Sequence, residues 1–313
     1  MIYKISAEEN GKTVKEVLRY GVGLSLAFTK QLKFLDNGIM LNGNRVTVRK
    51  IVSEGDILFL ATEDVEKENV LTPVDLPIDI VYEDEYIVLP NKSADMPTHP
   101  SHNHRGDTLA DALAYKYKQE GFPFVFRAIS RLDRNTSGLV LIAKDRISAS
   151  RLSDTMKNGN ISKAYIAILD GELPNDEGTI DTYIKREAES IIFRKVCKEN
   201  EGGDRAITKY KVIARQNGYS LVAASPITGR THQLRVHFSH IGFPILGDDM
   251  YGSASELIAR HALHAFSLEF AHPKTQEIMT LKAPLNKDIS ELIPKLFDEN
   301  ILAKLEHTTK NIF

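Results

Sequence analysis

One stretch of the chain, residues 129–145 (ISRLDRNTSGLVLIAKD), sets a charged turn directly against an apolar run. In it Asp133 lies between Arg131 and Arg134, and a polar turn follows. Residues 139–143 are apolar, short and bounded by turn residues, a pattern that predicts a buried strand. The sequence therefore predicts a carboxylate on a loop held by a rigid strand, a common position for catalytic groups. A structural Asx-turn flanked by surface arginines is the alternative.

The size and composition indicate a globular protein. A chain of 313 residues can hold one large domain and a small one. No apolar run reaches the roughly 18 residues that a membrane span needs, and residues 1–12 lack the apolar core of a signal peptide. Cys197 is the only cysteine, which excludes an intrachain disulfide and a multi-cysteine metal site. We expect a cytoplasmic protein with no membrane partner.

Positive charge is concentrated in two segments, although the net charge is −2. Residues 1–60 hold nine Lys and Arg against six Asp and Glu, and residues 127–163 hold eight against three. Nucleic-acid binding depends on where positive charge clusters rather than on its sum. The net charge therefore does not exclude a nucleic-acid partner.

Residues 1–62 predict a small α/β domain. A capping-box pattern at residues 13–16 opens one helix. Ser25 is expected to cap a second, which Asn37 and Gly38 end. The apolar stripe expected on that second helix consists of Leu26, Phe28, Leu32 and Leu35. The strands expected next lie at residues 39–41, near Val46, and at residues 57–60.

The remainder predicts a larger α+β domain. Residues 63–79 are acidic and are expected to form a linker, residues 80–300 the large domain, and residues 301–313 a tail. Expected strands cover residues 80–82, 86–89, 161–169, 206–214 and 219–225. Three helices are expected. The first starts at Asp107 or Thr108, the second covers residues 146–157, and the third starts at Thr231. Without regular β–α alternation, this order predicts a mixed, largely antiparallel sheet with flanking helices.

Four segments in order resemble RluA-type pseudouridine synthases. Residues 131–139 match R-L-D-x-x-T-S-G-L, residues 91–100 resemble N-K-P-A-G-M…H-P, residues 163–167 match K-x-Y-x-A, and residues 226–237 match P-x-T-G-R-T-H-Q-[IL]-R-V-H. The resemblance implies a curved central sheet with an active-site cleft, and an enzyme that isomerises uridines in RNA, with large-subunit rRNA as the expected substrate. Residues 1–62 resemble a small RNA-binding domain named after a ribosomal small-subunit protein.

The resemblance implies that Asp133 is the nucleophile and Arg235 its cationic partner. Uridine isomerisation breaks a carbon–nitrogen bond and makes a carbon–carbon bond without a redox step, so we expect no metal and no cofactor. The reaction needs an ionised carboxylate, and a nearby cation favours that form. A guanidinium stays charged and can pair bidentately. A surface charge on a helix is the alternative for Arg235.

Further residues match positions that contact RNA in this family. Tyr165 matches the tyrosine that stacks on the target base, and its hydroxyl can move a proton; a half-buried strand tyrosine is the alternative. Arg131 either contacts the flipped nucleotide or only attracts phosphates. The other predicted RNA contacts are Arg134, Arg230, Lys30, Lys33, Arg45, Arg49 and Lys50.

The chain departs from the family pattern at three positions. Ser130 stands where the family often has His, which puts local packing or RNA fit in question but not the nucleophile. Ser93 and Asp95 replace the usual Pro and Gly. Because Asp tolerates a left-handed backbone better than most residues, the loop is expected to keep its shape.

Two other chemistries are weaker alternatives. His99, His102 and His104 have a spacing that hints at metal, but no cysteine lies nearby and we expect no metal site. Ser137 or Ser130 with His232 would suggest a hydrolase, but no G-x-S-x-G elbow is present.

Three questions stay open at this stage. A tRNA-directed synthase would share the active site, and a non-catalytic RNA-binding or ribosome-assembly factor would share the fold. Attack on the sugar, attack on the base and a glycal route all fit an aspartate. The oligomeric state is undetermined, and we expect a monomer.

Overall fold

The computed structural model describes residues 1–62, 71–101, 104–190, 192–298, 300–302 and 305. Much of the expected linker (63–70) and tail (303–304, 306–313) lies outside the described residues. Within those ranges the chain forms two separate sheets, of four and 11 strands. None of the described helices has the length and apolar character to cross a membrane.

The N-terminal unit (residues 1–62) packs short helices on a small sheet of order β1-β4-β2-β3. All three strand pairings are antiparallel. Its elements are β1 (Ile2–Lys4), η1 (Ala7–Glu9), α1 (Val14–Glu16), η2 (Val17–Gly21), α2 (Leu26–Lys33), β2 (Ile39–Leu41), β3 (Asn44–Arg45) and β4 (Ile57–Leu60). The helices and the sheet share one apolar core that includes Val14, Leu18, Leu32 and Leu58.

Both predicted helix starts in this unit are confirmed. The Thr13 hydroxyl accepts a hydrogen bond from the Glu16 N–H, and the Glu16 carboxylate accepts one from the Thr13 N–H. Ser25 accepts from the N–H of Phe28 at 3.0 Å. Each side chain satisfies an amide that the first helical turn leaves unpaired.

Two expectations for the N-terminal unit are wrong, and one strand was not foreseen. Leu26 is 61% exposed, because it occupies the first helical position and projects away from the core. The helix α2 ends at Lys33, where the N–H of Phe34 turns back to Gln31 and Leu32, so Asn37 and Gly38 form a later turn. Strand β1 was not expected; three residues are too few to show a period.

The large sheet has the order β11-β10-β12-β13-β9-β14-β7-β6-β5, with β15 on β14 and β8 on β6. Its strands are β5 (Asp79–Glu83), β6 (Ile87–Lys92), β7 (Ser137–Leu139), β8 (Ile142–Ala143), β9 (Ser162–Asp170), β10 (Glu177–Arg186), β11 (Arg194–Cys197), β12 (Asp204–Gln216), β13 (Tyr219–Pro226), β14 (Leu263–Ala271) and β15 (Ile278–Lys282). Only β7 and β14 pair in parallel among the described strands. The expected α+β fold with a mixed, largely antiparallel sheet is confirmed.

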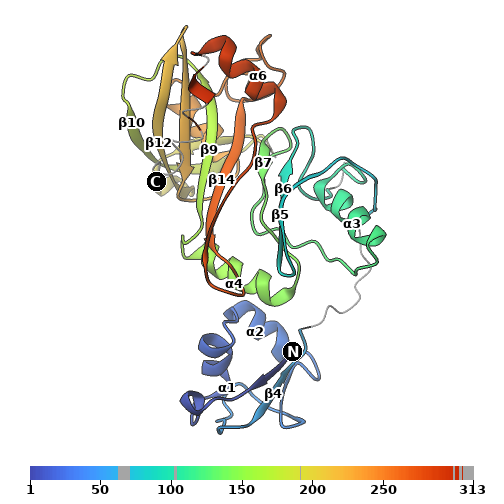
Figure 1. Cartoon of the computed structure of the whole chain (residues 1–313). Coiled ribbons are helices and arrows are strands. Elements are labelled where there is room, and N and C mark those ends of the chain that lie inside the picture. Colours follow the sequence, from blue (N-terminus) through green and yellow to red (C-terminus); the bar gives the residue numbers. More distant parts are fainter. Residues whose placement is uncertain (63–70, 102–103, 191, 299, 303–304, 306–313) are drawn as a thin grey trace.

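Helices flank this sheet in separate groups (Figure 1). They are α3 (Leu109–Gln119), α4 (Arg146–Lys157), the short η3 (Glu199–Glu201), α5 (Gln233–His240) and α6 (Lys287–Leu296). Helices α5 and α6 pack into the same apolar cluster as β9 and β13. Helix α3 packs with β6 and the segment between β7 and β8. This leaves the loops before β7 and before α5 to meet on a shared cleft.

Helix α4 joins the two units (Figure 1). The Ser25 N–H donates to the Ser150 hydroxyl at 2.8 Å, and the guanidinium of Arg146 lies 4.7 Å from the ring of Phe28. Arg19 pairs with Asp154 at the same junction. The predicted bounds of α4 are confirmed, including Asn158 as the residue that ends it.

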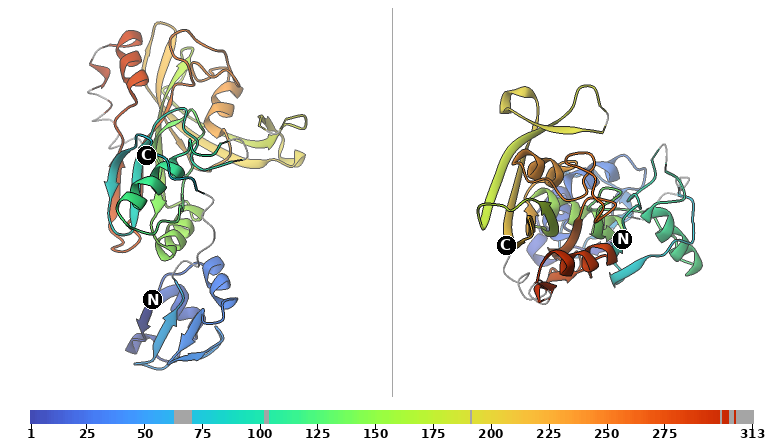
Figure 2. Two further views of the ribbon diagram at one scale, coloured as in Figure 1. Left: turned by 90° about the vertical axis from the view of Figure 1, so that its right-hand side faces the viewer. Right: turned by 90° about the horizontal axis from the view of Figure 1, so that it is seen from above.

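Three further expectations need correction. The apolar run 139–143 is buried throughout but divides into β7 and β8. Helix α5 begins at Gln233, and His232 rather than Thr231 occupies the capping position. Strands β10, β11 and the start of β12 form an arm that extends from the body of the sheet (Figure 2); the sequence indicated only the β12–β13 hairpin, which is confirmed.

Candidate active site

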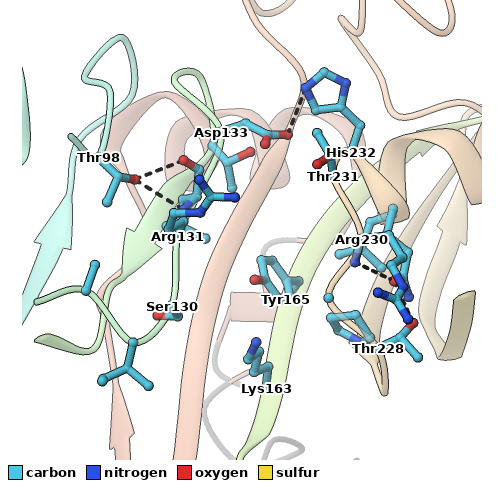
Figure 3. Close-up of a pocket in the computed structure, with 18 of the residues that line it drawn as sticks. Thr98, Ser130, Arg131, Asp133, Lys163, Tyr165, Thr228, Arg230, Thr231 and His232 are labelled. Carbon is cyan, nitrogen blue, oxygen red and sulfur yellow. Dashed lines mark hydrogen bonds and ion pairs between the residues drawn. The ribbon is translucent and has the colours of Figure 1, made fainter. Parts of the chain in front are cut away.

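The four segments singled out in the sequence meet at one cleft of about 860 Å³ (Figure 3). Its lining comes from within residues 97–101, 128–136, 156–165 and 226–235, together with Leu263. Asp133, Tyr165 and Arg235 all line it, together with Arg131, Arg134 and Arg230. Segments that are distant in the sequence therefore place the predicted carboxylate, aromatic ring and cations around one opening.

The loop that carries Asp133 is held from both sides by backbone contacts. The Thr98 hydroxyl donates to the carbonyl of Leu132 at 2.9 Å and accepts from its N–H at 3.2 Å. The carbonyl of Asp133 accepts from the N–H of Thr136 at 3.1 Å. Arg260 donates to the carbonyl of Asn135 at 2.9 Å. The carboxylate itself is left 29% exposed and faces the cleft.

Lys92 also holds the loop that carries Asp133. The sequence analysis gave this residue no role. Its ammonium group donates to the carbonyls of Ser93, Met96 and Arg134 at 2.8, 2.8 and 3.0 Å. These three acceptors match the three N–H bonds of a protonated lysine. The side chain is only 1% exposed, and burial lowers the pKa of Lys92 to about 7. The available sequence signal for Lys92 was its position in the segment 91–100, which resembles the N-K-P-A-G-M…H-P motif.

Behind the loop, β7 and β14 run so close together that only glycine fits at one position. Gly138 has φ +114, and a Cβ there would lie 2.3 Å from the carbonyl oxygen of Ala265. Ser137 and Thr136 bond the buried rings of His264 and His261 at 2.9 and 2.8 Å. Burial lowers the pKa of both histidines to about 3. Both rings are therefore uncharged at neutral pH, and their hydrogen bonds hold the residues that follow the Asp133 loop.

Arg235 lies beside Asp133, as predicted, but its stronger partner is Asp248. Its Nε and Nη2 donate to the two carboxylate oxygens of Asp248, both at 2.8 Å. Its Nη1 lies 3.5 Å from Oδ2 of Asp133. Burial favours a raised pKa for Asp248, but the bonds from Arg235 lower it overall. The sequence analysis gave Asp248 no role, although it lies shortly after the fourth motif.

Tyr165 and Lys163 project from the same face of β9 into the cleft (Figure 3). Burial, followed by the charge of Asp133, raises the pKa of Tyr165, so its hydroxyl keeps its proton. Burial lowers the pKa of Lys163. Tyr165 therefore presents an aromatic ring and a neutral hydroxyl to anything that enters beside Asp133.

The predicted RNA contacts fall into two places. Arg131, Arg134 and Arg230 are exposed at the cleft, where Arg134 pairs with Asp95 at 2.8 Å. Arg230 donates to a backbone carbonyl at 3.1 Å. The other five are exposed on the N-terminal unit: Lys30, Lys33, Arg45, Arg49 and Lys50. Of these, Arg45, Arg49 and Lys50 line a separate hollow of about 600 Å³.

The structure accommodates the departures from the family pattern. The Ser130 hydroxyl is buried and accepts the N–H of Leu141 at 3.1 Å, so it serves the loop. Asp95 has φ 60, the left-handed backbone expected of it. Ser130 is therefore part of the local hydrogen bonding, and Asp95 adopts a backbone conformation that aspartate tolerates.

The residues considered for the two other chemistries have the following contacts. Among the described residues no group of three or more His, Cys, Asp or Glu could hold a metal ion, and His102 lies outside them. The Ser137 hydroxyl bonds His264 rather than His232, and both partners are completely buried.

Comparison with known proteins agrees with this geometry. A model of the RNA pseudouridylate synthase family matches residues 85–240. An uncharacterized RNA pseudouridine synthase, YjbO of Bacillus subtilis (strain 168), is 38% identical over 90% of this chain and 98% of its own. Ribosomal large subunit pseudouridine synthase D of Buchnera aphidicola subsp. Schizaphis graminum is 32% identical over 82% and 85%. The structure of human RNA pseudouridylate synthase domain containing 1 covers 75% of this chain and 95% of its own, with TM-score 0.59 and 28% identity.

The mixed sheet and its cleft define a fold that pseudouridine synthases share. The chain belongs to the RluA-type RNA pseudouridine synthases and is an RNA-modifying isomerase. The resemblance found in the sequence motifs is thereby confirmed.

Proposed function

We propose that this synthase isomerises specific uridines of large-subunit rRNA, with Asp133 as the nucleophile on a uridine flipped out into the cleft. The observation that carries the proposal is the placement of Asp133 beside a buried guanidinium. The Nη1 of Arg235 lies 3.5 Å from the carboxylate, while the rest of that guanidinium is fixed by Asp248. A fixed cation favours the ionised form that a nucleophile needs.

The cleft suits a single nucleotide rather than a duplex. Its volume of about 860 Å³ is within the range of roughly 300–1,000 Å³ that holds small ligands. An enzyme that acts on a base inside a helix must first extrude it. Tyr165 would stack on the extruded uracil, and Arg131, exposed at the cleft, would contact the nucleotide or its phosphate.

The N-terminal unit would hold the RNA while the cleft acts. We assign residues 1–62 to RNA docking, 63–79 to a linker, 80–300 to catalysis and 301–313 to a tail. The exposed cations of the N-terminal unit would contact phosphates, which position RNA but carry little sequence information. Relatives named ribosomal large subunit pseudouridine synthase D support large-subunit rRNA as the substrate.

Pseudouridine mapping tests this proposal. Large-subunit rRNA and tRNA are sequenced for pseudouridine from cells with the gene, without it, and with a gene encoding Asp133→Asn. We expect at least one rRNA site to disappear with the gene, to return with the wild-type protein and to stay absent with the variant. Loss of a tRNA site alone would overturn the rRNA assignment, and loss of no site would contradict the proposed function.

A further inference from the structure

His232 stands out because its backbone is strained and its ring points at Asp133 (Figure 3). It has φ 58 and ψ 19, a left-handed conformation that is uncommon for a residue other than glycine. Its side chain is 11% exposed, and its Nε2 lies 3.9 Å from Oδ2 of Asp133. Strained backbone of this kind persists where the surroundings fix it, often at functional sites.

The other ring nitrogen of His232 is held by Tyr251. Its Nδ1 lies 2.8 Å from the Tyr251 hydroxyl oxygen, and that oxygen accepts the backbone N–H of Arg194 at 2.9 Å. Because the Tyr251 oxygen already accepts a hydrogen bond from the backbone N–H of Arg194, we infer that the Tyr251 hydroxyl donates its own hydrogen to Nδ1. Burial raises the pKa of Tyr251 and lowers that of His232, so the phenol stays protonated and the imidazole neutral.

A neutral imidazole that accepts at Nδ1 must carry its proton at Nε2, because the bond at one nitrogen sets the tautomer. The Nε2–H therefore faces the carboxylate of Asp133. Arg235 approaches the same oxygen, Oδ2, at 3.5 Å. Both donors therefore make their closest approach to the same oxygen of the carboxylate, Oδ2, rather than to Oδ1. A separation of 3.9 Å suits the RNA-free state, since catalytic hydrogen bonds tighten when substrate binds.

We propose that His232 is a positioning residue that presents Nε2–H to Asp133, with Tyr251 setting its tautomer, so that Oδ1 is the oxygen that reacts. The inference rests on the proposed function of Asp133. His232 acts through the carboxylate: together with Arg235 it fixes the rotation of the group and stabilises its charge. Tyr251 contributes by disfavouring the tautomer of His232 protonated at Nδ1, in which the lone pair of Nε2 would face the carboxylate.

Two substitutions separate this role from a structural one. In His232→Asn the amide occupies the place of Nδ1 and the left-handed backbone is well tolerated, but the donor to Asp133 is lost. In His232→Gln the longer amide can reach the place of Nε2 and donate, while the backbone is less well tolerated. Backbone preference therefore favours Asn, and the proposed chemistry favours Gln.

The experiment measures single-turnover pseudouridine formation, KM for RNA and thermal unfolding, with an RNA on which the wild-type enzyme is active. We expect His232→Asn to slow the reaction about tenfold to a hundredfold, the range for losing a hydrogen bond to a charged group. We expect His232→Gln to stay within about fivefold of wild type despite a lower unfolding temperature. KM should change little in both. Equal rates for the two variants, or a slower Gln variant, would overturn the inference.

Tyr251→Phe tests the tautomer-setting contact. We expect it to slow the reaction, and to have no further effect when combined with His232→Asn, because both act through one proton. Independent, multiplicative effects would overturn the role of Tyr251. Asp133→Asn separates this inference from the proposed function: retained activity there overturns the function, whereas an inactive Asp133→Asn beside unaffected His232 variants overturns the positioning role alone.

Discussion

The cleft and the N-terminal unit both carry many charges, but they hold them in opposite ways. In the cleft Arg235 is 4% exposed and contacts two carboxylates within 3.5 Å. On the N-terminal unit the side chain of Arg45 is 58% exposed and lies 3.7 Å from a fully exposed Asp36. Exposed pairs of that kind contribute little energy. We therefore expect the cleft to act through fixed geometry, and the N-terminal unit through the density of its charge.

This difference predicts that changes in the cleft affect the rate, while changes in the N-terminal unit affect RNA affinity. Helix α4 connects the two, because its first residues contact α2 and its last residues line the cleft.

The largest effect is expected from Asp133→Asn. Removing the proposed nucleophile should slow pseudouridine formation at least about 10³-fold, as for other covalent catalysts. RNA affinity should change less than about twofold, since phosphate contacts supply most of it. Single-turnover assays and RNA titrations measure the two quantities. Asp95→Asn, a neighbouring exposed carboxylate paired with Arg134, is the control and should stay nearly as active as wild type.

Asp248→Asn should break the buried pair with Arg235. Because the buried Arg235 would keep its charge with only the more distant carboxylate of Asp133 beside it, we expect about 3 kcal/mol less stability in urea unfolding and a slower reaction. Asp181→Asn removes a comparable but exposed pair with Arg205 and should hardly change stability. If the two variants were equally stable, the buried pair would not be what fixes Arg235.

Acid should weaken the contacts that His261 and His264 make to the loop that carries Asp133. The pKa of His261 and His264 is about 3 in the folded protein, below the value of 6.5 in an unfolded chain. The unfolded state therefore binds more protons between these values, and stability falls as the pH drops below about 6.5. Each histidine contributes up to about 1.4 kcal/mol per pH unit. Urea unfolding at pH 7 and 5.5 measures the loss, and His264→Gln should reduce it; an unchanged stability would contradict the assignment.

The smallest effects are expected on the N-terminal unit. Substituting Lys30, Lys33 or Arg45 by Gln should each raise KM for RNA a few-fold with kcat unchanged. Each should also reduce the slope of log affinity against log salt by about 0.7–0.9. Lys4→Gln, an exposed lysine on β1 outside the predicted set, is the control. A fall in kcat, or an affinity flat across salt concentrations, would contradict the division between the two regions.

Local patterns in the sequence predicted the local structure well. The caps at Thr13 and Ser25 are confirmed, as is α4, and of the two residues expected before α3 it is Thr108 that caps the helix. These features are local, because a capping side chain and the backbone it bonds lie within three residues. The cap at Thr231 failed because His232 adopts a left-handed conformation that only tertiary contacts support. The arm of β10 and β11 has no regular alternation of apolar residues, so its exposed strands gave no periodic signal.

The motifs predicted which residues gather at the site but not how they are supported. Asp133, Tyr165 and Arg235 meet in one cleft as expected. Their supports are contacts between distant segments: Lys92 with the carbonyl of Arg134, Thr98 with Leu132, and Arg235 with Asp248. A lysine ending an apolar strand and an aspartate after a helix carry no local sign of such partners. Only the assembled sheet brings them within bonding distance.

The most direct test is the structure of Asp133→Asn bound to its substrate RNA. The account predicts that the target uridine is extruded from the RNA into the cleft, stacked on Tyr165 and in contact with the side chain at position 133. It also predicts phosphates near the exposed cations of the N-terminal unit. A target uridine that stays stacked in the RNA, or that binds out of reach of position 133, would contradict the account.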